Sequence, residues 1–295
     1  MTPHPPSGHL LPREKALPNS GAERRVRGVV QTLAGEIGER NVTRPRAYAA
    51  AADFIEESLK NSRRQEFETG VNIEAEVAGN DEIIVVGAHY DTVIGSPGAD
   101  DNASGVAAVI ELARAFAGES TKRTIRFVAF ANEEPPHFAT PQMGSFRYAQ
   151  RCKERGERIV GMLSLETIGY FTDAPRSQQY PSMLDLFYPS IGNFIAFVSN
   201  LQSNRLLRRC VRQFRKHCEI PCASGALPEM ISGVAWSDQW AFWQFGYPAI
   251  MVTDTALFRN PHYHSPTDLP ATLDYQRLGR VVEGLTAMIG DLSEE

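Results

Sequence analysis

The segment from Ile83 to Gly105 constrains the fold of this chain more than any other. An unbroken apolar run, 83–86, ends in His89-Tyr90-Asp91, and a loop with glycine and proline then leads to Asp100-Asp101. Continuous apolar runs are typical of strands that are covered on both faces. An apolar helical pattern follows at 103–116. We therefore predict a buried strand, a crossing loop and a helix, with polar residues gathered at the crossing.

Strands and helices alternate along the rest of the chain. Strands are expected at residues 123–131, 159–165, 194–198 and 249–252, and helices at 145–155, 203–217, 237–245 and 274–292. This alternation indicates an α/β fold of three layers, in which a mostly parallel, mixed twisted sheet lies between helices. Ligand sites in such sheets form at the carboxyl ends of the strands.

The beginning of the chain is expected to add two amphipathic helices and a hairpin. The helices are predicted at 22–37 and after Pro45, where apolar residues recur at helical spacing. Residues 64–78 contain a strand-like alternation, and the turn signal Gly79-Asn80-Asp81 separates them from the strand at 83–88. This pattern predicts that those two strands pair as a hairpin or meander.

One domain accounts for most of the chain. Residues 1–20 are expected to form an N-terminal arm, and residues 21–295 a single domain. Within it, residues 171–190 are rich in Pro, Ser, Gln and Tyr and show no period, so they are predicted to be an inserted functional loop. The sequence leaves the oligomeric state open.

Composition and targeting signals exclude several classes of protein. The formal charge of −5 gives no basis for a nucleic-acid partner. No apolar stretch reaches the ~20 residues that a membrane span requires. The first 20 residues lack the apolar core of a secretory signal, so a cytoplasmic location is expected, with a secreted mature form left open. Cys218 and Cys222 are equally compatible with thiols and with a disulfide, and no C-x-x-C zinc pair occurs.

Acidic and histidine residues recur where the predicted strands end. They are His89, Asp91, Asp100, Glu133, Glu134, Glu166 and His264. If the strands are parallel, these positions meet at one edge of the sheet. Imidazole and carboxylate donors without thiolates suit zinc, with cobalt or manganese as substitutes. Five such donors can hold two divalent ions when one carboxylate bridges them.

Two adjacent ions predict a hydrolytic chemistry. They would polarise a carbonyl group and generate hydroxide from a shared water near neutral pH. A further carboxylate must take the proton from that water and deliver it to the leaving amine. The pair Glu133-Glu134 allows one glutamate to bind metal while its neighbour acts as the base.

Six ordered blocks resemble metallopeptidase family 28. They are GAHYDT at 87–92, PGADDNASG at 97–105, FANEE at 130–134, SLETIGY at 164–170, SDQW at 237–240 with FGYPA at 245–249, and YHSPTD at 263–268. The resemblance extends from about residue 82 to the C-terminus. It implies a zinc-exopeptidase-like fold, because the family comprises two-zinc aminopeptidases with glutamate-carboxypeptidase and glutaminyl-cyclase relatives.

The resemblance also implies a role for each residue. The implied zinc ligands are His89, Asp100, Glu134, Glu166 and His264. Among them Asp100 would bridge the two ions, and the peptide bond Asp100–Asp101 would be cis, whereas Asp101 itself is interpreted as a helix-start residue. Glu133 would be the general base, and Asp91 would orient His89 through its other ring nitrogen.

The expected function is a zinc-dependent aminopeptidase that acts on peptide or aminoacyl substrates. Two departures from the family stand beside this expectation: Glu166 occupies a position where many aminopeptidases have Asp, and Gln239 follows Ser-Asp where several relatives have His. A carboxypeptidase, another amidohydrolase with the same two-zinc centre and a catalytically silent binding domain are the alternatives. No arginine stands out in the matched blocks for binding a terminal carboxylate.

Two further segments receive an interpretation. Pro135, Pro136, Phe138 and the 171–190 loop are expected to shape a side-chain pocket because of their positions. The helix at 203–217 carries several basic residues, and a solvated face is favoured there over an anion site.

Overall fold

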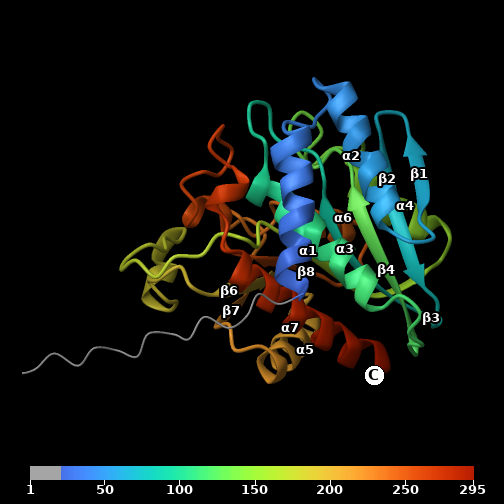
Figure 1. Cartoon of the computed structure of the whole chain (residues 1–295). Coiled ribbons are helices and arrows are strands. Elements are labelled where there is room, and N and C mark those ends of the chain that lie inside the picture. The colour runs from blue at the N-terminus through green and yellow to red at the C-terminus, as the bar shows by residue number, and fades with distance from the viewer. Residues whose placement is uncertain (1–20) are drawn as a thin grey trace, which may run out of the picture.

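The computed structural model describes residues 21–295, and the arm expected at residues 1–20 lies outside the described part. A single eight-stranded sheet forms its centre, in the order β1-β2-β4-β3-β5-β8-β6-β7 (Figure 1). The strands are β1 (Arg63–Phe67), β2 (Gly70–Val77), β3 (Asn80–His89), β4 (Arg123–Phe130), β5 (Arg158–Glu166), β6 (Ile195–Ser199), β7 (Cys222–Ala226) and β8 (Ala249–Thr253). The expected α/β class is confirmed.

Helices cover both faces of the sheet. The α-helices are α1 (Gly21–Val30), α2 (Pro45–Ser58), α3 (Gly105–Ala115), α4 (Gly144–Glu154), α5 (Asn204–His217), α6 (Gln239–Gln244) and α7 (Tyr275–Glu294). The short turns are η1 (Gln31–Ile37), η2 (Ala99–Ser104), η3 (Ser182–Leu186), η4 (Ala256–Phe258) and η5 (Pro270–Thr272). One apolar core joins the sheet to α1, α2, α3, α5 and α7, and a second joins it to α4 and α6. Among residues 21–295, no helix is both long and apolar enough to cross a bilayer.

The hairpin at the start of the sheet differs from the one expected. β1 and β2 form it, with Phe67 paired to Gly70, and β2 then pairs with β4 rather than with β3. β4 thus lies between the two strands that were predicted to be neighbours. All eight residues of β4 are buried, which favours an interior position, whereas β1 exposes Arg63 and Arg64 at the edge.

Four neighbouring strands are parallel and carry the site at one edge. β4, β3, β5 and β8 run in one direction, so their carboxyl ends lie together.

β6 runs antiparallel to β8. β6 takes this direction because of its connection to β5. Parallel pairing requires a crossover, usually a helix, and the long segment at 171–194 contains no crossover helix. α5 supplies one between β6 and β7, which are parallel. β7 was not predicted.

The inserted segment at 171–190 projects from the side of the sheet that holds β6 and β7 (Figure 1). It is tied back to the body through Gln178, whose side chain accepts a hydrogen bond from Arg259 Nε at 2.8 Å and donates to Thr255 at 2.8 Å. Its position at the carboxyl edge therefore brings this segment close to the residues considered next. All four cysteines are free thiols.

Candidate metal centre and substrate cavity

Two clusters of potential ligands meet at the carboxyl edge of the sheet. His89 Nε2 lies 3.3 Å from Asp101 Oδ1 and 3.3 Å from Glu166 Oε2. His264 Nε2 lies 3.1 Å from Asp101 Oδ2 and 3.3 Å from Glu134 Oε1. Each carboxylate oxygen of Asp101 thus faces one of the two clusters, and the residues of both are spaced to hold a metal ion. Asp101 is the residue that both clusters share.

The expectation that Asp100 bridges the clusters is wrong in this structure. Asp100 is fully buried and faces away from both histidines, because Oδ1 accepts a hydrogen bond from Gly169 N at 2.9 Å and Oδ2 accepts one from Asn260 Nδ2 at 2.7 Å. Adjacent side chains leave the backbone on different sides, so only one of the two aspartates can face the histidines. The cis peptide bond is correspondingly Asp101–Asn102, one residue later than expected.

Asp91 connects the first strand end to the glutamate pair. Its carbonyl oxygen lies 3.2 Å from His89 Nδ1, and its Oδ1 lies 3.5 Å from the same nitrogen. Its two carboxylate oxygens accept the backbone N–H groups of Glu133 and Glu134, each at 3.0 Å. One side chain therefore fixes both the imidazole and the turn after β4.

Glu166 and Glu133 complete the surroundings of His89. Ser237 Oγ donates to Glu166 Oε2 at 2.6 Å and lies 3.0 Å from Ser164 Oγ, so the Ser-Asp-Gln segment positions Glu166 through its serine. Glu133 Oε2 lies 3.8 Å from His89 Nε2, on the edge of the first cluster, and Glu133 belongs to neither ligand set. Glu133 is therefore free to act on a molecule bound beside the cluster.

Asp268 supports the loop that carries Asp101, and the sequence did not reveal this role. Asp268 Oδ1 accepts Asp100 N at 2.9 Å, and Oδ2 accepts Asp101 N at 3.1 Å. This carboxylate thus holds a segment that lies 167 residues away in the chain. Burial raises the pKa of this carboxyl to about 7.

Arg40 is a second supporting residue that the sequence did not indicate. It is fully buried, and its guanidinium donates to the carbonyl oxygens of Tyr90 at 2.7 Å, Pro97 at 2.6 Å and Gly98 at 2.9 Å. These contacts hold both ends of the loop between His89 and the aspartates. A single arginine between two helices carries no recognisable motif, which explains why it was missed.

Burial and mutual repulsion dominate the electrostatics of the site. Burial raises the pKa of Glu133 well above its usual value and that of Glu134 to about 7. For His264, burial lowers the pKa, but Asp101 and Glu134 outweigh it and raise the pKa to about 10. The site therefore concentrates negative charge in a dry environment, where a bound cation is strongly favoured.

The donor set fits a pair of divalent ions. His89 Nε2 and Glu134 Oε1 are buried and form no hydrogen bond within residues 21–295, although carboxylates or an imidazole surround each of them. Buried polar atoms are normally paired, so these two atoms, one in each cluster, fit sites that hold a cation. Each cluster supplies three donors without a thiolate, which suits zinc with one position left open.

A cavity of about 110 Å³ opens beside the first cluster. Two rows of paired residues form its floor: Glu166, Thr253, Ala196 and Ala223 run across β5, β8, β6 and β7, and Met251, Val198 and Gly225 lie in the next row. No α-helix of residues 21–295 lines this cavity, and small residues on the floor leave room above the sheet. The row of paired residues that begins at Glu166 therefore continues as the floor of the cavity.

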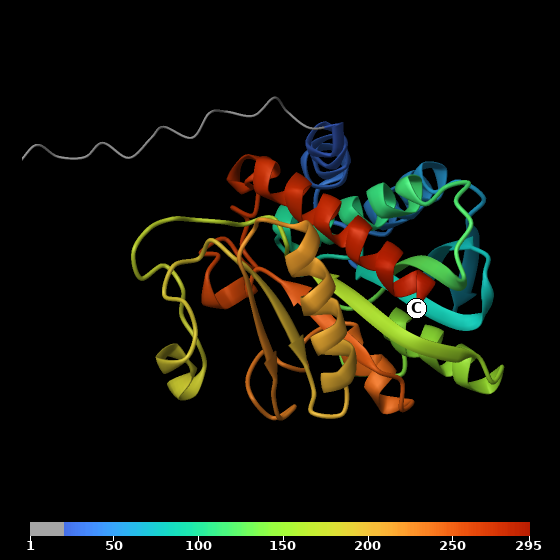
Figure 2. The same ribbon diagram turned by 90° about the horizontal axis from the view of Figure 1, so that it is seen from below.

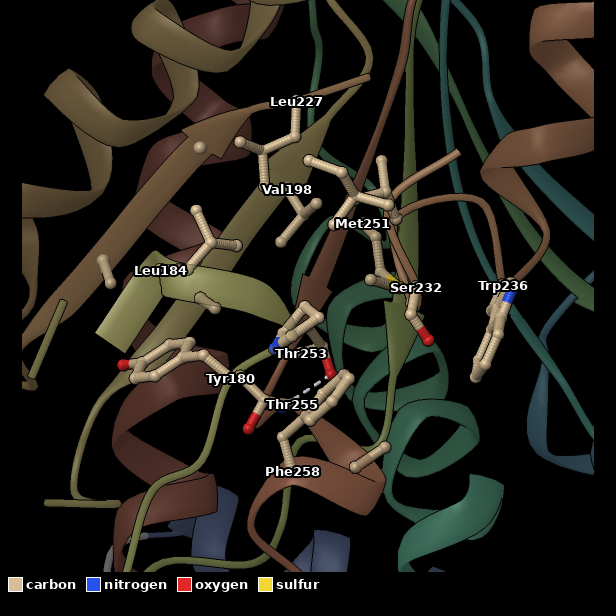
Figure 3. Close-up of a pocket in the computed structure, with 18 of the residues that line it drawn as sticks. Tyr180, Leu184, Val198, Leu227, Ser232, Trp236, Met251, Thr253, Thr255 and Phe258 are labelled. Carbon is tan, nitrogen blue, oxygen red and sulfur yellow. Dashed lines mark hydrogen bonds between the residues drawn. The ribbon is translucent and has the colours of Figure 1, made fainter. Parts of the chain in front are cut away.

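The inserted loop and two other segments form the walls of this cavity. Tyr180, Leu184 and Tyr188 come from the loop at 171–190, and Trp236 and Phe258 stand on other sides (Figure 3). Tyr188 is fixed by a hydrogen bond from its hydroxyl to the Ser224 carbonyl at 3.1 Å. The loop therefore shapes a pocket, as expected.

The other residues expected to shape this pocket do not line it. Pro135, Pro136 and Phe138 lie outside the cavity, and the Phe138 ring packs near Trp240 at 6.5 Å between centroids. Glu166 is the only charged residue among the described residues that line the cavity.

Comparison with known proteins agrees with this geometry. The model of peptidase family M28 matches residues 72–289. The uncharacterised protein YfbL of Escherichia coli (strain K12) is 39% identical over 216 residues, which cover 70% of this chain and 66% of that protein. Leucine aminopeptidase 1 of Arthroderma otae is 27% identical over 230 residues, which cover 72% and 54%. The chain spans about half to two thirds of the length of these relatives.

Solved structures share the fold. The LapA aminopeptidase of Legionella pneumophila superposes with a TM-score of 0.74 at 17% identity, covering 94% of this chain and 74% of that one. A glutaminyl cyclase of Fimbriiglobus ruber superposes with a TM-score of 0.68 at 19% identity, covering 95% and 97%. At these identities the likeness concerns the fold alone.

Proposed function

The chain belongs to peptidase family M28, and from this premise we propose that it is a two-zinc aminopeptidase. It would hydrolyse the N-terminal peptide bond of a peptide or aminoacyl substrate. The observation that carries the proposal is the pair of ligand clusters that share Asp101, with Glu133 beside them and an apolar cavity next to Glu166. The matched relative named leucine aminopeptidase supports the same reaction.

We assign one zinc ion to each cluster. The first would be held by His89, Asp101 and Glu166, and the second by Asp101, Glu134 and His264. Three protein ligands per ion leave a position open to substrate or water, as catalytic zinc sites do. Cobalt or manganese can occupy the same donors.

Glu133 is the group that moves the proton. Zinc, when bound, polarises the scissile carbonyl and lowers the pKa of the attacking water. The Glu133 carboxylate takes a proton from that water and then donates it to the leaving amine. Its own environment assists, because burial raises the pKa of Glu133 and so strengthens its affinity for a proton. Asp91 keeps Glu133 in place through the backbone.

The charges around the cavity favour binding of an N-terminus over binding of a C-terminus. A carboxypeptidase needs a cation for the terminal carboxylate, whereas the described residues that line this cavity include Glu166 and no Lys, Arg or His. A free α-amino group beside Glu166 and the shared carboxylate of Asp101 is electrostatically favoured. We therefore place the substrate's N-terminal residue at this end of the site.

The cavity also indicates the preferred N-terminal side chain. Its walls are apolar and aromatic (Figure 3). The small residues Ala196, Ala223 and Gly225 leave room above its floor. Burial of an apolar side chain contributes about 1.5–3 kcal/mol. We propose that leucine, methionine and phenylalanine are preferred over charged residues at the N-terminus.

An assay of the zinc-loaded protein on a substrate panel tests the function. Leucine and phenylalanine 4-nitroanilides with free amines should be cleaved, and their N-acetylated forms should not. Glu133→Gln should retain two zinc ions per chain and lose activity by about 10²–10⁴-fold, the usual contribution of a general base. Elemental analysis measures the zinc.

Four outcomes would contradict the proposal. Cleavage confined to blocked substrates would favour another amidohydrolase, and cleavage only at a free C-terminus would favour a carboxypeptidase. Absence of bound metal after reconstitution would favour a silent binding domain. Full activity of Glu133→Gln would show that another group is the base.

A further inference from the structure

One face of α5 carries a row of arginines that the proposed catalysis does not use. Arg205, Arg208, Arg212 and Arg215 are all exposed. Spacings of three, four and three residues place them within an arc of roughly 80° on one side of the helix, over about 15 Å of its length. Figure 2 shows α5 beside α7 at the surface of the molecule, where these helices pack together.

Three of these arginines have no partner in the described part of the chain. Arg205, Arg208 and Arg212 form no ion pair and no side-chain hydrogen bond with any residue from 21 to 295. Nearby basic residues differ: Arg209 forms an ion pair with Glu295, and Arg215 Nη2 donates to the Cys222 carbonyl at 3.2 Å. The chain as a whole carries a formal charge of −5. Its positive charge is therefore locally concentrated on α5.

The arginines line hollows rather than a flat surface. Arg205, Arg208, Arg209 and Arg212 border one depression together with Asn204, Arg123 and the acidic Glu295. Arg208, Arg212 and Arg215 border an adjoining one beside β7. Arg208 and Arg212 belong to both, so the two depressions form one continuous groove, which we call the α5 arginine groove.

The groove lies away from the metal centre. Arg123 begins β4, whereas Glu133 follows the end of β4. The groove and the metal centre therefore lie at opposite ends of the parallel strands. The groove can therefore be occupied while the proposed catalytic site is free or bound.

We propose that the α5 arginine groove binds a small anion that carries several phosphate groups. The guanidinium fork binds phosphate oxygens in pairs, which makes arginine the preferred residue for this contact. Successive arginines rise by about 4.5–6 Å along the helix, so they can contact neighbouring phosphate groups of one ligand. Adsorption to a membrane would require an apolar face beside the charges. The stripe of α5 offers only arginines, acidic Glu295 lines the groove beside them, and Asp291 pairs with neighbouring Lys216.

Isothermal titration with tripolyphosphate tests the proposal on the zinc-loaded full chain at 150 mM salt. The wild type should bind it saturably at one site per chain. The variant Arg205→Glu/Arg208→Glu/Arg212→Glu should bind at least tenfold more weakly. The matched control Arg46→Glu/Lys60→Glu/Arg155→Glu reverses three exposed basic residues elsewhere on the surface, whose side chains form no ion pair or hydrogen bond with residues 21–295, and it should bind within twofold of the wild type. Both variants lower the formal charge by six, so a general charge effect would appear in both.

The other arms separate the possible sources of the signal. Inorganic phosphate should bind far more weakly than tripolyphosphate, and equal affinities would overturn the requirement for several phosphate groups. Flotation with phosphatidylglycerol vesicles should show no groove-dependent binding, and vesicle binding without tripolyphosphate binding would replace the proposal with a membrane contact. Absence of wild-type binding, or equal loss in the control, would also overturn it. Unchanged melting temperatures show that both variants fold.

Discussion

Two adjacent aspartates in η2, the turn before α3, have different functions because their side chains face different neighbours. Asp101 lies between His89 and His264, whereas Asp100 accepts hydrogen bonds from Gly169 and Asn260. These contacts tie the turn after β5 and the loop before His264 to the loop that carries Asp101. Asp100 therefore holds the segments that carry ligands, and it does not face either proposed zinc ion.

This difference predicts opposite outcomes for two isosteric substitutions. Asp101→Asn should abolish zinc binding at both positions, because each of its oxygens serves one cluster. Asp100→Asn should retain both ions with affinity about 10–100-fold weaker, the usual effect of removing a group that supports a ligand. Competition with a chelating dye measures both affinities. The reverse result, loss of zinc in Asp100→Asn alone, would restore Asp100 as the bridge.

At the scale of elements, the last two strands of the sheet, β6 and β7, determine the shape of the cavity. Ala223 and Gly225 on β7 pair with Ala196 and Val198 on β6, and they face the cavity. Ala226, on the same strand, packs instead against the core on the α5 side. We therefore expect substitutions on the cavity face of β7 to affect binding of the proposed substrate and substitutions on the other face to affect stability.

Enlarging a residue of the floor should change the side-chain preference. Ala223→Val should lower kcat/KM for phenylalanine and leucine anilides about tenfold and leave the alanine anilide within twofold, because methylene-sized changes in an apolar pocket discriminate about 10–200-fold. Ala226→Val is the matched control on the opposite face and should leave the ratio of these rates unchanged. An equal loss for all three anilides with Ala223→Val would contradict the assignment of the pocket.

At the scale of the whole molecule, folding gathers like charges from distant segments. Asp101, Glu133, Glu134 and Glu166 come from three separate connections, and all are buried. Burial raises the pKa of Glu133 and Glu166 and brings that of Glu134 to about 7. The folded state thus carries an electrostatic cost that divalent ions relieve.

Removal of metal should therefore destabilise the whole domain at neutral pH. A ligand at 100 times its dissociation constant stabilises the folded state by about 2.7 kcal/mol, or roughly 5–10 °C in melting temperature for a domain of this size. Calorimetry before and after chelation measures the shift, and zinc should restore it. His89→Ala/His264→Ala is the control, and its melting temperature should not respond to zinc.

The metal-free protein should also depend on pH in a defined direction. Its glutamates with raised pKa values, and His264 with a pKa of about 10, bind protons more tightly when folded than when unfolded. Stability is then highest at mildly acidic pH and falls as pH rises through about 7. A metal-free protein that melted higher at pH 8 than at pH 5.5 would contradict this account.

The sequence by itself determined the fold class and the edge at which the site lies. The apolar run before His89 and the alternation after it specify a buried parallel strand, and the polar residues at strand ends must then converge. His89, Glu134, Glu166 and His264 are brought together as expected. These features are local or periodic, so they are visible without contacts.

Only the tertiary structure decided which aspartate the clusters share and what supports it. The direction of the Asp100 and Asp101 side chains depends on donors supplied by Gly169 and Asn260 and on an acceptor supplied by Asp268, all of which are distant in the chain. The support from Arg40 and the floor formed by β6 and β7 likewise arise from long-range packing and strand register. Local patterns contain no information on such contacts, because they form only when separate segments are folded against each other.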